Sequence, residues 1–176
     1  DRLVDDFTEV WHAKMRDVPF VNKALSVEAV GFRRHEGRIL GVLISPWFMN
    51  LIVLPDGEDW SGLVPGEKET LVFPSGEYEF LHNTRDMIGG YKACSLFSPM
   101  GEFTRQKDAA DVARAVMEAL FDPAHRAETD RVADIRAARE AELAPPEDAD
   151  DTAEIDPTPT RRAIITGGLS QAEGAV

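Results

Sequence analysis

The sequence predicts an α+β fold, in which an antiparallel sheet of five or six strands between Ser26 and Phe97 is flanked by N-terminal and C-terminal helices. Apolar residues recur at three- and four-residue intervals at the start of the chain and again after about residue 107, which is typical of amphipathic helices. Between them, short alternating apolar and polar runs are separated by turns containing proline and glycine, which is typical of half-buried strands. The most apolar stretch of the chain, Ile39 to Leu54, lies in this central region.

The first predicted helix spans Asp1 to Arg16. Its apolar residues fall on one helical face, and several acidic residues lie near its front, where the helix dipole favours negative charge. Pro19 limits the helix. The apolar residues are Leu3, Phe7, Val10, Trp11 and Met15.

The sheet is predicted from a series of short strands. Ser26 to Phe32 alternates between apolar and polar residues, and the polar segment Arg33 to Gly37 is predicted as a turn. The central apolar stretch is too short and too broken by Pro46 to span a bilayer as a helix. We interpret it as two buried strands, Arg38 to Ser45 and Asn50 to Leu54. The remaining predicted strands are Glu67 to Phe73, Glu77 to His82 and Ile88 to Phe97.

The turn between the two buried strands is unusually apolar. It carries Trp47, Phe48 and Met49 in succession, where a hairpin turn is normally polar. Either another element covers this turn as the end of the core, or part of it stays exposed as a docking surface for an apolar partner. Both interpretations hold if Phe48 is buried while Trp47 or Met49 faces outward. A second turn that contains a methionine, Ser98 to Gly101, follows the last strand.

Two helices and a polar tail are predicted after the sheet. Lys107 to Phe121 has a broad apolar face, with Asp108 as its predicted N-cap. Ala124 to Leu143 is rich in alanine, arginine and glutamate, and we predict a helix that packs weakly. Residues 1–144 are therefore assigned to one folded domain, and the acidic, proline-containing residues 145–176 to a disordered tail.

Composition excludes several classes of function. The formal net charge of −13 argues against a nucleic-acid partner, because neutralising phosphates requires a basic face, and it favours a partner with a basic segment. A single cysteine, Cys94, forms no internal disulfide, which fits a reducing compartment. The first residues carry charges throughout and do not resemble a signal peptide. We therefore predict a cytoplasmic protein without a membrane span.

Motifs for catalysis or cofactor binding are missing from the sequence. The histidines are far apart, so no zinc motif is present, and no nucleophile elbow or phosphate-binding loop occurs. We therefore expect no catalytic residues, no metal and no cofactor, and predict a binding protein rather than an enzyme. One alternative is a small enzyme whose pocket gathers His82, Cys94 or Tyr91 with a carboxylate. Another is a structural subunit whose apolar turn is a permanent interface.

Three segments resemble the accessory chaperones of nickel–iron hydrogenase assembly of the HybE type. The run Pro-Trp-Phe-Met-Asn at residues 46–50 is the most specific part of this resemblance, which covers Asp1 to Phe121. Two shorter matches fit between the main segments in the expected order. The main segments are Val30 to Phe32, Gly41 to Leu51, and Ser95 to Met100 with Phe103, and the shorter ones are Phe73 to Gly76 and Gly90 to Tyr91.

The resemblance implies a non-catalytic cytoplasmic chaperone. Such proteins bind the hydrogenase small-subunit precursor, which carries a twin-arginine export signal, and delay its export until assembly is complete, with other maturation proteins as further partners. Some relatives carry a rubredoxin-like part with cysteine pairs. This chain has only Cys94, so the resemblance does not extend to electron transfer or iron delivery.

A receptor for a twin-arginine signal needs negative potential beside an apolar groove, because the signal combines a basic end with an apolar stretch. The chain offers net negative charge and two turns with adaptable methionines. In the tail, Thr160 to Ile165 resembles the start of such a signal, and we hypothesise that Arg161 and Arg162 make it an internal placeholder; the alternative is an accidental arginine pair. The predicted partner-binding residues are Pro46, Trp47, Phe48, Met49, Asn50, Phe97, Met100 and Phe103.

Overall fold

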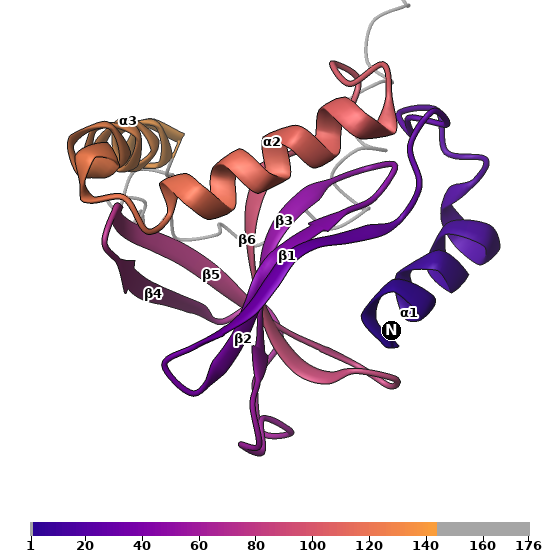
Figure 1. The fold of residues 1–176 in the computed structure, drawn as a ribbon, viewed down its shortest axis with the longest axis horizontal. Coiled ribbons are helices and arrows are strands. Elements are labelled where there is room, and N and C mark those ends of the chain that lie inside the picture. Colours follow the sequence, from indigo (N-terminus) through magenta and orange to yellow (C-terminus); the bar gives the residue numbers. More distant parts are fainter. Residues whose placement is uncertain (1, 144–176) are drawn as a thin grey trace, which may run out of the picture. The chain divides into compact units, whose positions relative to one another are not determined.

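The computed structural model describes residues 2–143, and those up to Glu140 form one compact unit. The predicted disordered tail and the Arg161-Arg162 segment lie outside the described residues. Six antiparallel strands form one sheet in the order β1-β2-β3-β6-β5-β4, with helices before and after it (Figure 1), which confirms the predicted fold class. The strands are β1 (Glu28–His35), β2 (Arg38–Ile44), β3 (Met49–Pro55), β4 (Lys68–Phe73), β5 (Gly76–Arg85) and β6 (Gly89–Phe97).

Helices occur where the helical spacing predicts them. The first is α1 (Arg2–Val10), continued by a π-helical turn over Trp11–Met15. After the sheet come α2 (Gln106–Ala119), a short 3₁₀ turn and α3 (Arg126–Leu143). Asp108 is not the N-cap of α2 as predicted: Arg105 occupies that position, and Asp108 sits in the first turn, bound to the Arg105 guanidinium at 2.8 Å. None of the described helices is both long and apolar enough to cross a membrane.

The predicted turn from Arg33 to Gly37 is shorter than expected. β1 continues to His35, and only Glu36 and Gly37, both with positive φ, form the turn to β2. The reason is an irregularity in the β1–β2 register between Val30 and Arg33, where Gly31 has a φ of 68°. Such a bulge adds a residue to one strand, so a segment without simple alternation still pairs with its neighbour.

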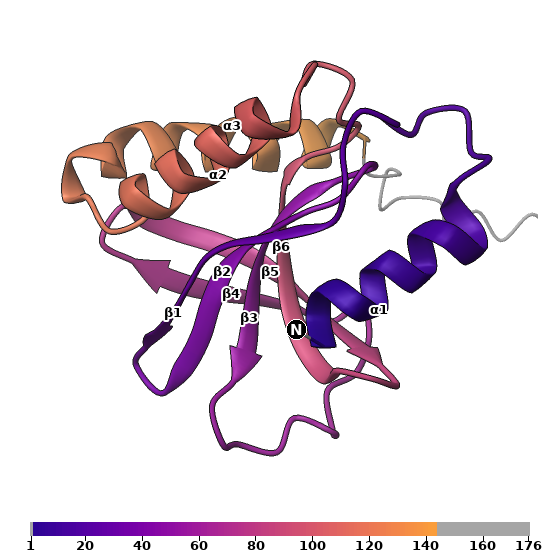
Figure 2. The same cartoon turned by 45° about the vertical axis from the view of Figure 1, so that its right-hand side comes forward.

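Two apolar clusters hold the helices on opposite faces of the sheet. α2 contributes small buried residues to the main core, while α1 contributes Leu3 and Phe7 to a second cluster (Figure 2). On β3, Leu51 and Val53 point into the main core and Ile52 points into the second cluster, as expected for alternating side chains. Both faces of the central strands are therefore covered, which explains why their sequence is so continuously apolar.

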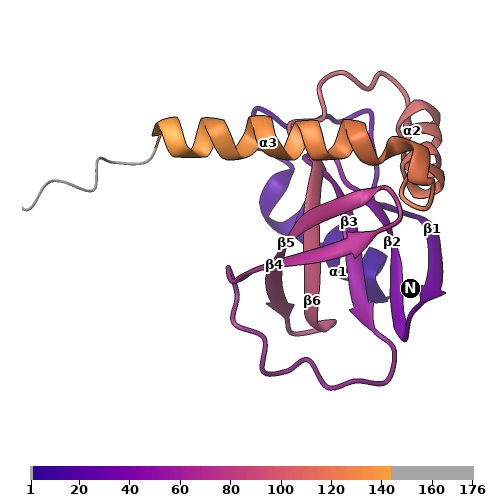
Figure 3. The same ribbon diagram turned by 90° about the vertical axis from the view of Figure 1, so that its left-hand side faces the viewer.

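A long connection, residues 56–67, carries the chain from β3 in the middle of the sheet to β4 at its edge (Figure 3). It is fastened to β5, because His82 donates its backbone N–H to Glu67 O and accepts one from Gly66, both at 2.8 Å. It also rests on β6 at Gly90, where an added Cβ would lie 2.1 Å from the carbonyl oxygen of Trp60. Only glycine permits this close approach of two backbones.

Candidate functional site

The turn between β2 and β3 and the turn after β6 meet in space. β3 pairs with β6 so that Met49 lies opposite Phe97, and the Ser98 hydroxyl donates a hydrogen bond to Trp47 O at 3.4 Å. We call these two segments, residues 45–50 and 97–103, the aromatic corner. All eight predicted partner-binding residues therefore belong to one region of the structure.

Ser45 explains how an apolar sequence forms the first turn. Its hydroxyl oxygen accepts the Phe48 N–H at 3.0 Å and the Trp47 N–H at 3.4 Å, and its backbone N–H donates to Phe48 O at 2.8 Å. Pro46 follows in a position that suits its fixed φ. Because one buried hydroxyl satisfies the turn's own N–H groups, the turn needs little water and tolerates aromatic side chains.

Asn22, in the linker after α1, ties the two turns of the aromatic corner together. Its side-chain amide donates to Met100 O at 2.9 Å and to Phe103 O at 2.6 Å, and its backbone N–H donates to Pro46 O at 2.8 Å. Sequence reasoning missed this residue, because its partners lie up to 81 positions away along the chain.

The expectation that methionines are presented at the surface is wrong. Met49 and Met100 are both 0% exposed and belong to the main core, to which α2 also contributes. Pro46 and Phe103 are also buried. Of the eight predicted partner-binding residues, the four that reach the surface are half-buried: Trp47, Phe48, Asn50 and Phe97.

Helix α1 covers one side of the aromatic corner. The Trp11 and Trp47 rings stack with centroids 6.2 Å apart, and Phe7 meets the edge of Phe48 at 5.6 Å. The buried Asp6 carboxylate accepts a hydrogen bond from Arg85 on β5, which raises the pKa of the Arg85 guanidinium. The corner is therefore partly covered by α1 and the π-helical turn that follows it, which aromatic contacts and the Asp6–Arg85 ion pair hold against the sheet.

Asn50 leaves an unused acceptor in this region. Its side-chain Oδ1 is buried and has no hydrogen-bond partner among the described residues. Asn50 follows Met49, which points into the main core, so the alternation of β3 places Asn50 on the α1 face, as it does Ile52. A buried acceptor without a donor costs free energy.

A second polar group lies away from the corner, where β4, β5 and β6 run side by side. The Glu69 carboxylate accepts from His82 Nε2 and from Lys92 Nζ, each at 2.6 Å, and the Trp60 ring lies over the ammonium at 4.4 Å. Burial acts to raise the pKa of Glu69, but the hydrogen bonds from Lys92 and His82 outweigh it and lower that pKa. This buried ion cluster, Glu69–His82–Lys92, fastens the sheet edge to the β3–β4 connection.

The enzyme alternative requires a pocket that gathers His82, Cys94 or Tyr91 with a carboxylate, and this ion cluster provides only part of it. His82 has a carboxylate partner, but Cys94 lies in the main core and Tyr91 in the second cluster on the other face. Among the described residues, no group of three or more His, Cys, Asp or Glu side chains is arranged to hold a metal ion.

The lowered pKa of Glu69 predicts a pH dependence of stability. Because the folded pKa lies below the ordinary value of 4.5, Glu69 stabilises the fold above that value, and the contribution is lost as pH falls through the lower folded pKa. The difference in free energy of unfolding between the wild type and Glu69→Gln should therefore shrink between about pH 5 and pH 3. Urea denaturation of both proteins across this range measures it, and a constant difference would contradict the prediction.

The fold and the site define a class: a small α+β protein whose eight predicted contact residues form one aromatic corner at the ends of two central strands. Comparison with known families places it more closely. The family model for the NiFe-hydrogenase assembly chaperone HybE matches residues 1–167, and the chain belongs to this family. The resemblance carried by residues 46–50 and the neighbouring segments is thus confirmed, and the family's role is assembly of a hydrogenase.

Relatives bear related names. A Rhodobacter capsulatus protein described as a probable rubredoxin, HupJ, is 64% identical over 182 residues, covering 98% of this chain. This chain spans 66% of that protein, slightly under two thirds. The hydrogenase expression/formation protein HupJ of Bradyrhizobium diazoefficiens is 40% identical over 131 residues, covering 74% of this chain and 76% of that protein. The solution structure of HybE from Escherichia coli shares the fold, with a TM-score of 0.56 and 23% identity over 68% of this chain and 74% of that one.

Proposed function

We propose that this protein is a non-enzymatic, cytoplasmic chaperone that binds the small-subunit precursor of a nickel–iron hydrogenase together with its twin-arginine signal. It delays export of the precursor until assembly is complete. Membership of a hydrogenase assembly chaperone family supports the general role. The observation that carries the specific proposal is the aromatic corner, where Trp47, Phe48 and Phe97 are half-buried rather than sealed in the core.

The corner offers the two kinds of contact that a basic, apolar segment requires. Half-buried aromatic rings provide large apolar area with little side-chain entropy to lose, as in many binding hot spots. Exposed carboxylates on the elements that build or cover the corner, Glu9 on α1 and Glu102 in the second turn, attract arginines, and the net charge of −13 strengthens the attraction at long range.

Substituting alanine for Trp47 and Phe97 together tests the proposal. Capture of the purified precursor should weaken roughly 10- to 100-fold, because truncating each of two interface aromatic residues should cost about 1 kcal/mol of binding free energy and about 1.4 kcal/mol corresponds to a factor of ten. The side chains are half-buried at the periphery of the core, so thermal unfolding should still be cooperative. Titration by biolayer interferometry with the precursor and with a signal-less small subunit measures both the corner's role and the need for the signal.

The matched control is Val64→Ala. Val64 is an exposed large apolar residue in the β3–β4 connection, and its removal should leave capture unchanged. Equal affinity of the double variant and the wild type for the precursor would refute the aromatic corner as the client site. Equal affinity of the wild type for precursor and signal-less subunit would refute recognition of the signal.

A further inference from the structure

Strand β4 is an open edge of the sheet. The strand order ends at β4, which pairs only with β5, so every second residue of β4 directs its backbone N–H and C=O away from the sheet. Proteins usually protect such edges with proline, with charges or with bulges. β4 has no proline within Lys68–Phe73 and pairs with β5 in an unbroken register. Its two charged residues, Lys68 and Glu69, lie at its start and are both ion-paired, whereas Val72 near its end is 63% exposed. The edge is available to an added strand.

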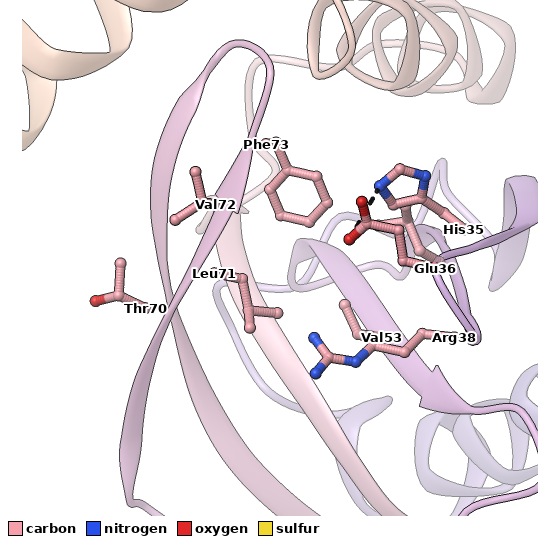
Figure 4. A pocket seen from close by; sticks show the side chains of 9 residues that line it. His35, Glu36, Arg38, Val53, Thr70, Leu71, Val72 and Phe73 are labelled. Atoms are coloured by element: carbon pink, nitrogen blue, oxygen red, sulfur yellow. Dashed lines mark ion pairs between the residues drawn. The ribbon is translucent and has the colours of Figure 1, made fainter.

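A pocket of about 170 Å³ lies beside this edge. One wall is β4 from Thr70 to Phe73, the floor is apolar, and the opposite wall is the end of the β1–β2 hairpin (Figure 4). The two ends of the sheet thus face each other across the pocket. Pockets that hold small organic ligands are usually larger, about 300–1,000 Å³, so this one suits one or two side chains. The apolar residues that line it are Leu40, Val53, Leu71 and Phe73.

The hairpin wall supplies an uncompensated positive charge. Figure 4 shows the Arg38 guanidinium extended toward β4, and within residues 2–143 it has neither an ion pair nor a hydrogen-bond partner. The neighbouring arginines are engaged elsewhere: Arg34 pairs with Asp56 at 2.9 Å, and Arg33 lies over the Phe121 ring at 3.7 Å. Glu36 also lines the pocket, but its carboxylate is highly exposed and lies 3.9 Å from His35, and within the described chain no ion pair joins it to Arg38. A half-buried guanidinium without a partner is costly, and a carboxylate compensates it.

We infer that the β4 edge and this pocket bind an extended segment of a partner polypeptide in which aliphatic residues alternate with an acidic residue. The segment pairs with β4 through its backbone, places an aliphatic side chain over Leu71 and Phe73, and pairs its carboxylate with Arg38. Recognition by strand addition takes its affinity from main-chain hydrogen bonds and its specificity from pockets for alternate side chains.

This site is separate from the aromatic corner. The two sites lie at opposite ends of the β2–β3 pair. The corner adjoins Ile44 at the end of β2 and Met49 at the start of β3, whereas the pocket is lined by Arg38 at the start of β2 and Val53 near the end of β3. Acidic peptides that lack a twin-arginine signal therefore test it without testing the proposed client site, and either proposal can fail alone.

The test uses the full chain and three capped peptides. The first, Thr-Leu-Thr-Asp-Thr-Leu-Thr, directs leucine and aspartate to one side; the second replaces aspartate by asparagine; the third replaces the threonine after aspartate by proline, which removes a backbone N–H. Backbone amide shifts measured by NMR titration should change in residues 68–73 and 35–40 with the first peptide. The asparagine peptide should bind about tenfold more weakly, as expected for loss of a charge-assisted hydrogen bond, and the proline peptide should bind weakest.

Two arginine variants make the test specific. Arg38→Gln should weaken the aspartate peptide about tenfold and make it equal to the asparagine peptide, whereas Arg34→Gln, with the same loss of charge outside the pocket, should leave binding unchanged. Equal effects of the two substitutions, shifts away from β4, or no binding of any peptide would each overturn the inference. So would a concentration-dependent dimer, detected by sedimentation, that the aspartate peptide dissociates, because the edge would then belong to a second copy.

Discussion

Replacing Phe7 by alanine is expected to detach α1 from the sheet while leaving the six strands paired. Phe7 is 5% exposed and is the central contact of the helix, with Phe48 at 5.6 Å, Tyr91 at 6.4 Å and Arg85 over its ring at 5.0 Å. Truncating a buried phenylalanine costs about 3–5 kcal/mol. A nine-residue helix has almost no stability of its own, so α1 depends on this contact.

The loss should be local, because Phe7 belongs to the second cluster and the main core between the sheet and α2 does not include it. Hydrogen exchange measures the result: amides of residues 2–15 should lose protection, and those of β3 and β6 should keep it. Val4→Ala, a truncation of a half-buried residue of the same helix, is the control and should change protection little. Unchanged protection of α1 in Phe7→Ala, or equal loss of protection in helix and strands, would contradict a locally attached helix.

The general fold was predictable because local patterns determine it. The alternation of apolar and polar residues predicted the strands, and the helical spacing of apolar residues predicted α1 and α2, because each element must bury one face. The pattern failed where a single residue changes the geometry. The bulge at Gly31 extends β1 through Arg33 and Arg34, which a strict alternation assigns to a turn.

The location of the aromatic corner could be predicted from the sequence, but the exposure of its side chains could not. The unusual run at residues 46–50 indicated the corner, and chain pairing of β3 with β6 brings the second turn to it. Which side chains face outward depends on contacts that sequence does not reveal. Met49 is buried because α2 covers that face, and Trp47 is partly covered because Trp11 stacks on it. The ties that fix these positions, Asn22 to Phe103 and Asp6 to Arg85, join residues about eighty positions apart.

The buried ion cluster also depends on contacts that the sequence does not reveal, because its three members come from three strands. Lys92 is 6% exposed, and its ammonium is bound by the Glu69 carboxylate and covered by the Trp60 ring. Removing one partner of a buried ion pair usually costs about 3–5 kcal/mol, because the other charge is left without compensation. Glu69 is one-third exposed and keeps its bond to His82, so we expect Lys92→Met to cost about 2–4 kcal/mol.

Lys107→Met is the matched control for this substitution. Lys107 also binds a carboxylate at 2.6 Å, that of Asp111, but its side chain is 76% exposed, and exposed pairs contribute about 0–1 kcal/mol. Urea denaturation at neutral pH should therefore separate two lysines with the same pair geometry. Adding Glu69→Gln to Lys92→Met should recover part of the loss, because the uncompensated carboxylate is gone and contacting residues are not additive. Equal destabilisation by the two lysine substitutions would mean that burial of the ammonium under Trp60 does not set the strength of this cluster.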